Sequence, residues 1–313
     1  MLPVLRPMLA TPAEPFDSAD YRFEVKWDGI RALTAVEGGR LRLWGRERAD
    51  YRDRYPELQG LRSLPSGTLL DGELVALCDG RAELNRLLRR HHLSSPWKIQ
   101  QAQRHTPVRY ILFDILYYHG RSLLDEPFKS RQAALEEWFG GQEDPLLMLC
   151  RGTEAAGKKF FAETIAQGHE GVVAKHVSGR YRPGQRSASW RKIKPVHVIP
   201  CVVIGYTPGP EGFHSLLVAA SCQGTLRYVG ELTCGFTASA KAEGAAGLRQ
   251  RPRSRPIVAC PKRAQWVEPE WYCQVQFLGW TAYHRLHGAS FQRWIAPQGI
   301  LAPLQTGPEA IAP

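Results

Sequence analysis

The sequence predicts an α+β protein of two domains, with antiparallel sheets and flanking helices over residues 1–196 and a smaller β domain over residues 197–305. The first part alternates short β-type runs with segments whose apolar residues recur every three to four positions, which is typical of strands followed by helices. From about residue 198 the chain changes to short apolar runs divided by glycine and proline, such as CVVIGYT, SLLVAAS, LRYVGELTCGF and WYCQVQFLGWTAYHRLHG. This pattern indicates a small barrel or sandwich. Residues 306–313 are expected to form a disordered tail.

Residues 21–36 predict two strands joined by an Asp28-Gly29 turn, because Asp-Gly between apolar runs is a strong hairpin signal. A further strand, RLRLWGR, follows the Gly38-Gly39 turn. Residues 68–77 predict either a pair of strands or one bulged strand, and residues 108–120 predict a buried strand.

Three segments of the first domain have helical periodicity. Residues 82–93 predict a basic amphipathic helix, and residues 129–141 predict a helix that ends at Gly140-Gly141. The segment GKKFFAETIAQGHEGVVAKH predicts a third helix, a glycine stop and then a strand from Gly171 to Lys175.

The chain of 313 residues carries a formal net charge of +11, which favours a polyanionic partner, nucleic acid first. A charge that serves only solubility is the alternative. Basic residues concentrate in two stretches, Arg249, Arg251, Arg253, Arg255, Lys262 and Arg263 in one and Arg86, Arg89, Arg90, His91 and His92 in the other.

Cysteine usage and hydropathy indicate a cytoplasmic protein without a membrane partner. The seven cysteines form no C-x-x-C pair, which argues against a disulfide framework and a structural zinc site. The sequence has no run of about 18 apolar residues, and prolines and a charge interrupt its apolar N-terminus.

Five short stretches between Lys26 and Lys194 carry the functional argument. Taken alone, each has an ordinary structural explanation: Asp-Gly is a favoured turn, a phenylalanine in an apolar run is normally core, and lysines at a strand edge guard against aggregation. Their joint occurrence in one order is the informative observation. The stretches are KWDGIR with Lys26, Asp28 and Arg31, LLDGEL with Glu73, LFDIL with Phe113 and Asp114, HEGVVAK with Glu170 and Lys175, and WRKIKP with Lys192 and Lys194.

This order and spacing resembles the covalent nucleotidyltransferase superfamily of ATP-dependent DNA ligases, RNA ligases and mRNA capping enzymes. The flanking stretches RPMLAT, LRLWGRERADYRDRYPEL and YILFDILYYHG resemble the bacterial end-joining DNA ligases, the LigD- and LigC-like group, over nearly all of residues 5–196. The resemblance implies a nucleotidyltransferase (adenylation) domain followed by an OB-fold β-barrel. It also implies ATP as cosubstrate, Mg²⁺ or Mn²⁺ as cofactor, and nicked or broken double-stranded DNA as the partner.

The implied reaction has three steps: Lys26 takes AMP from ATP, AMP passes to a DNA 5′-phosphate, and a 3′-hydroxyl displaces AMP. The first step needs a neutral amine, and an unperturbed lysine of pKa about 10.4 is neutral in only roughly one molecule in 2,500 at pH 7. Arg31, Lys192, Lys194 and a bound metal are candidates for the cationic field that lowers that pKa. If the strand prediction holds, Lys26 and Asp28 project to one face, where Asp28 can orient the amine.

The resemblance gives the other residues their roles. Glu73 is expected at the ribose hydroxyls, with Phe113 and Val173 on the two faces of adenine. Lys192 and Lys194, two residues apart on a predicted strand, are expected to face the triphosphate and to act in catalysis with Lys26 and Asp28. The implied ATP contacts are Glu24, Arg31, Arg46, Glu73, Phe113, Val173, Lys192, Lys194 and Arg293, the metal ligands are Glu170 and Glu73, and the DNA contacts are Arg46, Arg249, Arg251 and Arg253.

The chain departs from its family near the C-terminus. The last motif of these ligases carries an arginine and then Asp-Lys, whereas Arg293 is followed here by Trp-Ile-Ala-Pro, so Arg285 or Arg293 would have to serve. Self-adenylation is therefore expected to be slow and the sealing of a pre-adenylated nick efficient. The short stretch before Lys26 further predicts a monomeric two-domain core that binds the nick through basic faces of both domains.

Two alternatives stay open from the sequence. One is an RNA ligase of the same superfamily, and the other is a catalytically weak scaffold that binds DNA ends. A DNA-end-binding protein as recruiting partner is a further open point.

Overall fold

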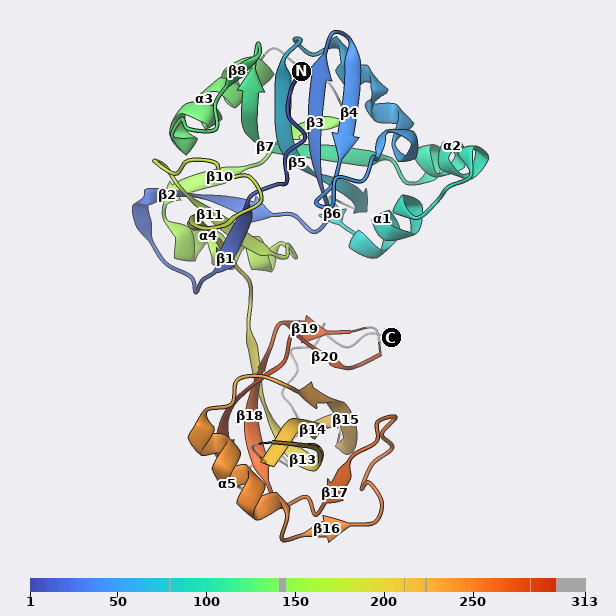
Figure 1. Cartoon of the computed structure of the whole chain (residues 1–313), viewed down its shortest axis with the longest axis vertical. Helices are drawn as coiled ribbons and strands as arrows, with labels where there is room; N and C mark the ends of the chain where they lie inside the picture. The colour runs from blue at the N-terminus through green and yellow to red at the C-terminus, as the bar shows by residue number, and fades with distance from the viewer. Residues whose placement is uncertain (79, 141–144, 211, 223, 282, 297–313) are drawn as a thin grey trace. The chain divides into compact units, whose positions relative to one another are not determined.

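The structure is a computed structural model that describes residues 1–78, 80–140, 145–210, 212–222, 224–281 and 283–296. The chain divides into two compact units, Met1–Lys194 and Pro195–Pro313 (Figure 1). The predicted tail over residues 306–313, and the end of the predicted second domain from residue 297, lie outside the described residues.

Two sheets form the framework of the first unit (Figure 1). Apart from the parallel pairs β1–β12 and β7–β9, their strands pair antiparallel, as the α+β prediction requires. The five-stranded sheet has the order β1 (Leu9–Pro12), β12 (Arg186–Ile193), β11 (Gly171–His176), β2 (Ser18–Lys26) and β10 (Gly152–Ala155). The seven-stranded sheet has the order β4 (Arg40–Trp44), β3 (Ile30–Glu37), β5 (Thr68–Cys78), β7 (Val108–Tyr118) and β8 (Arg121–Ser122), with β6 (Arg81–Ala82) on β5 and β9 (Leu147–Leu149) on β7.

The predicted hairpin over residues 21–36 is wrong, because its two strands belong to different sheets. β2 pairs with β10 and β11, whereas β3 pairs with β4 and β5. The Asp28-Gly29 pair is therefore a crossing between sheets. A Cβ added to Gly29 would lie 2.2 Å from the Leu74 carbonyl oxygen, so this glycine lets the chain pass close to β5. The crossing brings the end of β2 to the seven-stranded sheet.

The other predicted elements of the first unit are confirmed with shifted bounds. β5 is one strand with register shifts at Leu69/Leu70 and Asp71/Gly72, which decides for the bulged strand. The predicted helices are α1 (Leu84–His91), α3 (Phe128–Phe139) and α4 (Gly157–Ala166). The sequence analysis missed α2 (Pro96–His105), whose proline at the helix start is a usable signal, and the 3₁₀ helices η1 (Arg52–Arg54) and η2 (Pro56–Ser63).

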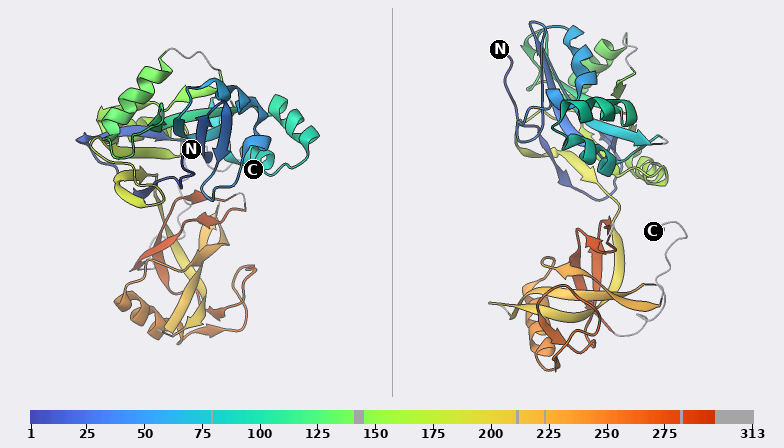
Figure 2. Two further views of the ribbon diagram at one scale, coloured as in Figure 1. Left: turned by 45° about the horizontal axis from the view of Figure 1, so that its top comes forward. Right: turned by 90° about the vertical axis from the view of Figure 1, so that its right-hand side faces the viewer.

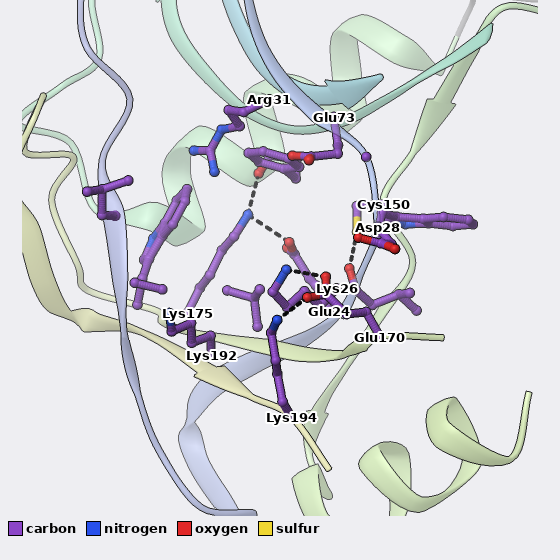
Figure 3. Close-up of a pocket in the computed structure, with 18 of the residues that line it drawn as sticks. Glu24, Lys26, Asp28, Arg31, Glu73, Cys150, Glu170, Lys175, Lys192 and Lys194 are labelled. Carbon is purple, nitrogen blue, oxygen red and sulfur yellow. Dashed lines mark hydrogen bonds and ion pairs between the residues drawn. The ribbon is translucent and has the colours of Figure 1, made fainter. Parts of the chain in front are cut away.

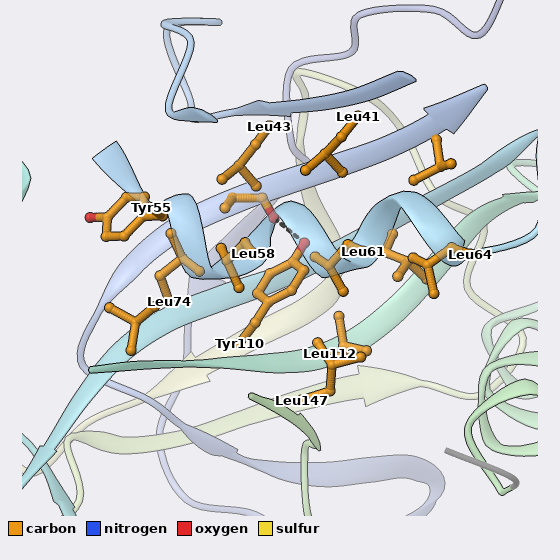
Figure 4. Close-up of a cluster of buried hydrophobic side chains, with 14 of the residues drawn as sticks. Leu41, Leu43, Tyr55, Leu58, Leu61, Leu64, Leu74, Tyr110, Leu112 and Leu147 are labelled. Atoms are coloured by element: carbon orange, nitrogen blue, oxygen red, sulfur yellow. Dashed lines mark hydrogen bonds between the residues drawn. The ribbon is translucent and has the colours of Figure 1, made fainter. Parts of the chain in front are cut away.

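Both faces of the seven-stranded sheet are buried, and alternation along β7 distributes its side chains between two clusters. Tyr110 and Leu112 pack with η2 residues such as Leu58 and Leu61, where the Tyr110 hydroxyl donates to the Ala32 carbonyl at 2.9 Å (Figure 4). Ile111 and Phe113 point to the opposite face, where they join a cluster with Tyr181 and Trp190. The second face is the one that lines the candidate site described below.

The described residues of the second unit form a seven-stranded antiparallel sheet, a separate two-stranded sheet and one helix. Its strands β13 (His197–Gly209), β14 (Gly212–Cys222), β15 (Thr225–Leu232) and β18 (Tyr272–Phe277) confirm the four predicted runs. Helix α5 (Ala238–Leu248) packs on β14 and was not predicted, since its small residues lack a clear apolar stripe. The remaining strands are β16 (Pro252–Arg253), β17 (Gln265–Val267) and β21 (Ser290–Ile295), and β19 (Gly279–Trp280) pairs only with β20 (Leu286–His287) among the described residues.

Within the described ranges, no helix combines the length and the apolar character that crossing a membrane would need.

A buried ion pair between Arg131 of α3 and Asp114 of β7 yields a first prediction. Both side chains are fully buried, with Nε to Oδ1 at 2.7 Å and Nη2 to Oδ2 at 2.9 Å. Arg131→Met would leave Asp114 charged and unpaired in the core, so we expect a loss of about 3–5 kcal/mol in the free energy of unfolding. Urea denaturation measures it. Arg121→Ala, at a side chain 73% exposed, is the control and should cost at most about 1 kcal/mol; equal losses in the two variants would contradict the prediction.

His91, at the end of α1, yields a second prediction. Its ring lies between the Arg54 guanidinium at Nε2 and the Tyr55 hydroxyl at Nδ1, each at 2.8 Å. Burial, and then the charges of Arg54 and His92, lower the pKa of His91 from 6.5 to about 4. Between these values the unfolded chain binds a proton that the folded protein does not, so stability falls as the pH falls.

We expect the thermal midpoint of the wild type to drop more steeply between about pH 7 and about pH 4.5 than that of His91→Gln. Parallel curves for the two proteins would show that the pKa of His91 is the same in the folded and unfolded chains, which would contradict the prediction.

Candidate active site

A cavity of about 410 Å³ lies between the two sheets of the first unit (Figure 3). It exists where the chain crosses from β2 to β3, and both sheets contribute to its lining. Seven cationic and four acidic side chains line it, so the cavity carries a formal excess of positive charge. The cations are Lys26, Arg31, Arg46, Lys175, Arg186, Lys192 and Lys194, and the acids are Glu24, Asp28, Glu73 and Glu170.

Glu170 joins two lysines at the ends of β2 and β12, the strands on either side of β11. Its Oε2 pairs with Lys26 Nζ at the end of β2, and its Oε1 pairs with Lys194 Nζ just past β12 (Figure 3). Burial favours the neutral acid, but the two lysines outweigh burial and hold the pKa of Glu170 below its ordinary value. Glu170 therefore stays ionised and fixes the Lys26 amine at the cavity wall.

Asp28 lies beside this group, although not as predicted. β2 ends at Lys26, so the expected projection of Lys26 and Asp28 from one strand face is wrong. Asp28 lines the cavity from the crossing segment instead. Burial, and then the Glu170 carboxylate, raise the pKa of Asp28, whereas the pKa of Glu170 is lowered.

Arg31 is held by partners within the protein. Its Nε and Nη2 donate to the two oxygens of buried Asp71 at 2.6 Å each, and Asp71 also accepts from the Tyr181 hydroxyl at 2.6 Å. The Arg31 guanidinium lies 4.5 Å from the centre of the Phe113 ring. This fork-shaped pair fixes Arg31 and Phe113 together at one wall of the cavity.

Lys175 forms a second buried pair that the sequence analysis did not place in the site. The residue is 1% exposed, and its Nζ lies 2.7 Å from both Glu24 Oε2 and the Phe113 carbonyl oxygen. The same ammonium lies 4.5 Å from the ring centres of Phe113 and Trp190. Alternation along β11 could have indicated it, since Lys175 shares a strand face with Val173, which was predicted to be in the site.

One oxygen of the Glu24 carboxylate accepts no hydrogen bond from the described residues. This atom, Oε1, is buried, and Arg22 Nε is 3.6 Å away. Burial raises the pKa of Glu24, and the Lys175 ammonium acts against that rise. A buried acceptor in the lining of a cavity is suited to a ligand that donates a hydrogen bond.

Two further predicted residues, Lys192 and Lys194, differ in whether their side chains have a partner within the described part of the protein. The side chain of Lys192, on β12, forms no hydrogen bond or ion pair with the residues that the structure describes, whereas Lys194 lies one residue past the strand and its ammonium is bound to Glu170. Burial, and then the charges of Arg186 and Lys194, lower the pKa of Lys192. Burial raises the pKa of Glu73 to about 7, so this side chain is half neutral near neutral pH.

The remaining predicted residues divide between the two units. Arg46, Phe113 and Val173 line the cavity. Four predicted residues lie in the second unit. Arg293 donates to Gln274 Oε1 at 2.9 Å, and Arg249 is the C-cap of α5. Arg253 pairs with Glu268 at 2.8 Å, and Arg251 lies 3.6 Å from Glu270. Within the described ranges, no three His, Cys, Asp or Glu side chains are grouped to hold a metal ion.

Comparison with known proteins identifies both units. The sequence profile of the ATP dependent DNA ligase domain matches residues 7–194, and that of the ATP dependent DNA ligase C terminal region matches residues 209–295. The chain is 31% identical over 302 residues to the multifunctional non-homologous end joining DNA repair protein LigD of Mycobacterium tuberculosis, a match that covers 92% of this chain and 38% of LigD. It is 32% identical over 267 residues to a DNA ligase of Methanoculleus marisnigri, covering 81% of this chain and 46% of that ligase. The chain thus spans less than half the length of these relatives.

Solved structures agree with these matches. The ligase domain of M. tuberculosis LigD aligns with a TM-score of 0.56 and 27% identity over 99% of this chain and 98% of that domain. A mycobacterial DNA ligase D complexed with ATP and MES aligns with a TM-score of 0.55 and 28% identity over 94% of this chain and 96% of that one. The predicted nucleotidyltransferase domain and the predicted OB-fold type of the second unit are confirmed. The chain therefore belongs to the ATP-dependent DNA ligase family and is of the LigD type.

Proposed function

We propose that this protein is a DNA ligase (ATP) that seals nicks or paired ends in double-stranded DNA through a lysyl-AMP intermediate. The observation that carries the proposal is the position of Lys26, whose amine Glu170 holds at the wall of a positively charged cavity. The names of the relatives support DNA rather than RNA as substrate, and the LigD name supports broken ends. The ATP in the mycobacterial neighbour supports ATP as the cosubstrate.

In the first step the Lys26 amine attacks the α-phosphorus of ATP. The Lys26 N–P bond forms, the bond to the bridging oxygen breaks, and pyrophosphate leaves. Lys26 must first lose a proton, and Asp28 is the carboxylate we assign to accept it, since burial and the Glu170 charge raise the pKa of Asp28. Glu170 keeps Lys194 as a partner when Lys26 is neutral. Lys192, without an ion-pair partner among the described residues, is assigned to the triphosphate.

The wall with Phe113 is assigned to adenine. Phe113 and Val173 supply apolar surface for the two faces of the base, and Glu73 is assigned to the ribose hydroxyls. Glu24 Oε1, which accepts no hydrogen bond from the described residues, is assigned as an acceptor for the exocyclic amine of adenine. Guanine presents an oxygen at that position, so this carboxylate favours ATP over GTP.

Glu170 and Glu73 are the residues that would hold Mg²⁺ or Mn²⁺. Both are oxygen donors in the lining of the same cavity, and Mg²⁺ in phosphate-binding sites needs only one or two carboxylates besides water and phosphate oxygens, so the residues fit. A bound ion supplies positive charge to the phosphate oxygens.

The second and third steps return the site to its starting state. The DNA 5′-phosphate attacks the AMP phosphorus, the N–P bond to Lys26 breaks, and the amine recovers its proton. The 3′-hydroxyl then attacks the activated 5′-phosphate and AMP leaves. Arg46 at the cavity, and Arg249, Arg251 and Arg253 of the second unit, are assigned to DNA, although Arg251 and Arg253 already have acidic neighbours. A monomeric state, a cytoplasmic location beside DNA and recruitment by a DNA-end-binding protein remain predictions.

Covalent labelling tests the proposal directly. Incubation with α-labelled ATP and Mg²⁺ should transfer label to the wild type, and Lys26→Ala should remain unlabelled because it lacks the nucleophile. Lys129→Ala, at an exposed lysine on α3, is the control and should label normally. A wild type that binds nicked DNA but never takes up label would favour the DNA-end-binding scaffold instead.

The absence of Asp-Lys after Arg293 yields a separate prediction. We expect single-turnover sealing of a pre-adenylated nick to be at least about tenfold faster than self-adenylation from ATP, a difference of about 1.4 kcal/mol in activation free energy. Rapid-quench measurements of both steps on one preparation decide it. Equal rates would mean that the altered C-terminal motif does not limit adenylation.

A further inference from the structure

We propose that the exposed cations of α1 and α2, namely Arg89, Lys98 and Arg104, bind backbone phosphates of the duplex that flanks the nick. This surface is called the α1–α2 basic surface below. The inference rests on the proposed function, because it extends the DNA footprint of the same cavity.

The charge of this segment is one-sided in the sequence. Residues 84–113 contain six lysines and arginines and no aspartate or glutamate. The three histidines of the segment, His91, His92 and His105, add no negative charge either. Such a segment carries a positive potential that its own side chains do not cancel.

The structure separates these cations into two groups. Arg86 Nη2 donates to the His105 carbonyl oxygen at 2.6 Å, and Arg90 donates to the Thr106 carbonyl oxygen and to Glu57 Oε2, each at 2.6 Å. These arginines cap the last turn of α2 and tie α1 to η2. They stabilise the helix pair and are not available to a ligand.

The second group has no such role. Arg89, Lys98 and Arg104 are exposed, and none of their side chains forms a hydrogen bond or ion pair with the described residues. Trp97, next to Lys98, is 67% exposed, so its ring is accessible to a ligand. Exposed cations without protein partners, with an aromatic ring beside them, are typical of surfaces that bind nucleic acid.

The position of the helix pair fits a duplex held at the cavity. α1 begins at Leu84, which lines the cavity, and Arg89 lies five residues further along, about 7.5 Å at 1.5 Å per residue. α1 and α2 lie on the side of the first unit opposite α3, in Figure 1 and in the left view of Figure 2. One turn of B-DNA is about 34 Å long, so a duplex with its nick at Lys26 can reach the α1–α2 basic surface within its first turn.

The chemistry favours phosphates over an acidic protein. The site already has to hold a polyanion, and separate, unpaired cations match evenly spaced phosphates without any pocket of their own. The contact would be independent of base sequence. Its energetic signature is the release of counterions, which makes binding depend on salt.

The test compares the triple variant Arg89→Ala/Lys98→Ala/Arg104→Ala with a matched triple, Lys129→Ala/Lys158→Ala/Lys159→Ala, which removes the same charge from exposed residues of α3 and α4. Binding is measured on nicked duplexes over a salt series, with flanks of about 6 or about 18 base pairs lengthened on one side at a time. Self-adenylation is measured on every variant.

For the α1–α2 triple we expect Kd to rise at least about tenfold at about 0.1 M salt, and the slope of log K against log salt to become shallower by about 2 to 3. The loss should occur only with the long flank on one side, and AMP labelling should equal that of the wild type. The matched triple should show neither the flank dependence nor the same change in slope.

Equal Kd and equal salt slope in the two triple variants would overturn the proposal. If the α1–α2 triple variant then proved to have lost affinity for an acidic protein, the surface would bind that protein and the proposal would still be overturned. If the triple variant fails to fold, the single reversal Lys98→Glu at its exposed site replaces it, with Lys158→Glu as control and the same expectation at smaller size. Absence of AMP label on the wild type would instead overturn the proposed function, so the two failures are distinguishable.

Discussion

The site depends on one constraint of the backbone, the passage of residues 27–29 from one sheet to the other. β2 and β3 each have both edges occupied by other strands, so they cannot pair with one another as the Asp-Gly turn suggests. Gly29 makes the passage sterically feasible beside the Leu74 carbonyl. Lys26 is consequently the last residue of β2, at the point where the chain leaves the five-stranded sheet. The cavity is the space that the crossing leaves between the five-stranded and seven-stranded sheets. A hairpin at this point would have placed the lysine at a solvated edge.

Charge pairing then divides the lining of the cavity into fixed and available groups. The Arg31–Asp71 and Lys175–Glu24 pairs are buried, and each also contacts the Phe113 ring or carbonyl, so they fix the wall assigned to adenine. Burying such pairs contributes little net stability, because desolvation offsets most of the attraction. Their use here is positional. The available charge on Lys192 lies in the part of the cavity lining that we assign to the triphosphate.

The sequence analysis named most of the charged residues in the cavity lining and missed the parts that depend on distant pairing. The joint order of short motifs, and its resemblance to the ligase family, identified Lys26, Glu73, Phe113 and Glu170, which all line the cavity. The hairpin failed because the same Asp-Gly letters suit a tight turn and a close crossing, and only the pairing partners of β2 and β3 decide between them. Lys175 was named in its motif but received no role in the site, because a lysine is normally solvated. Its burial depends on Glu24 of another strand and on two aromatic rings.

The same distinction governs the basic residues of α1. In the sequence, Arg86, Arg89 and Arg90 form one run, and counting charge treats them alike. In the fold, the 3.6-residue period turns Arg86 and Arg90 onto the face that carries the Thr106 contacts and leaves Arg89 exposed. A net charge of +11 therefore overstates what DNA can meet, since many cations are already bound to carboxylates or carbonyls. What binds a polyanion is the unpaired remainder. In this family member that remainder includes Lys192 at the cavity and Arg89, Lys98 and Arg104 on the helix pair that begins beside it.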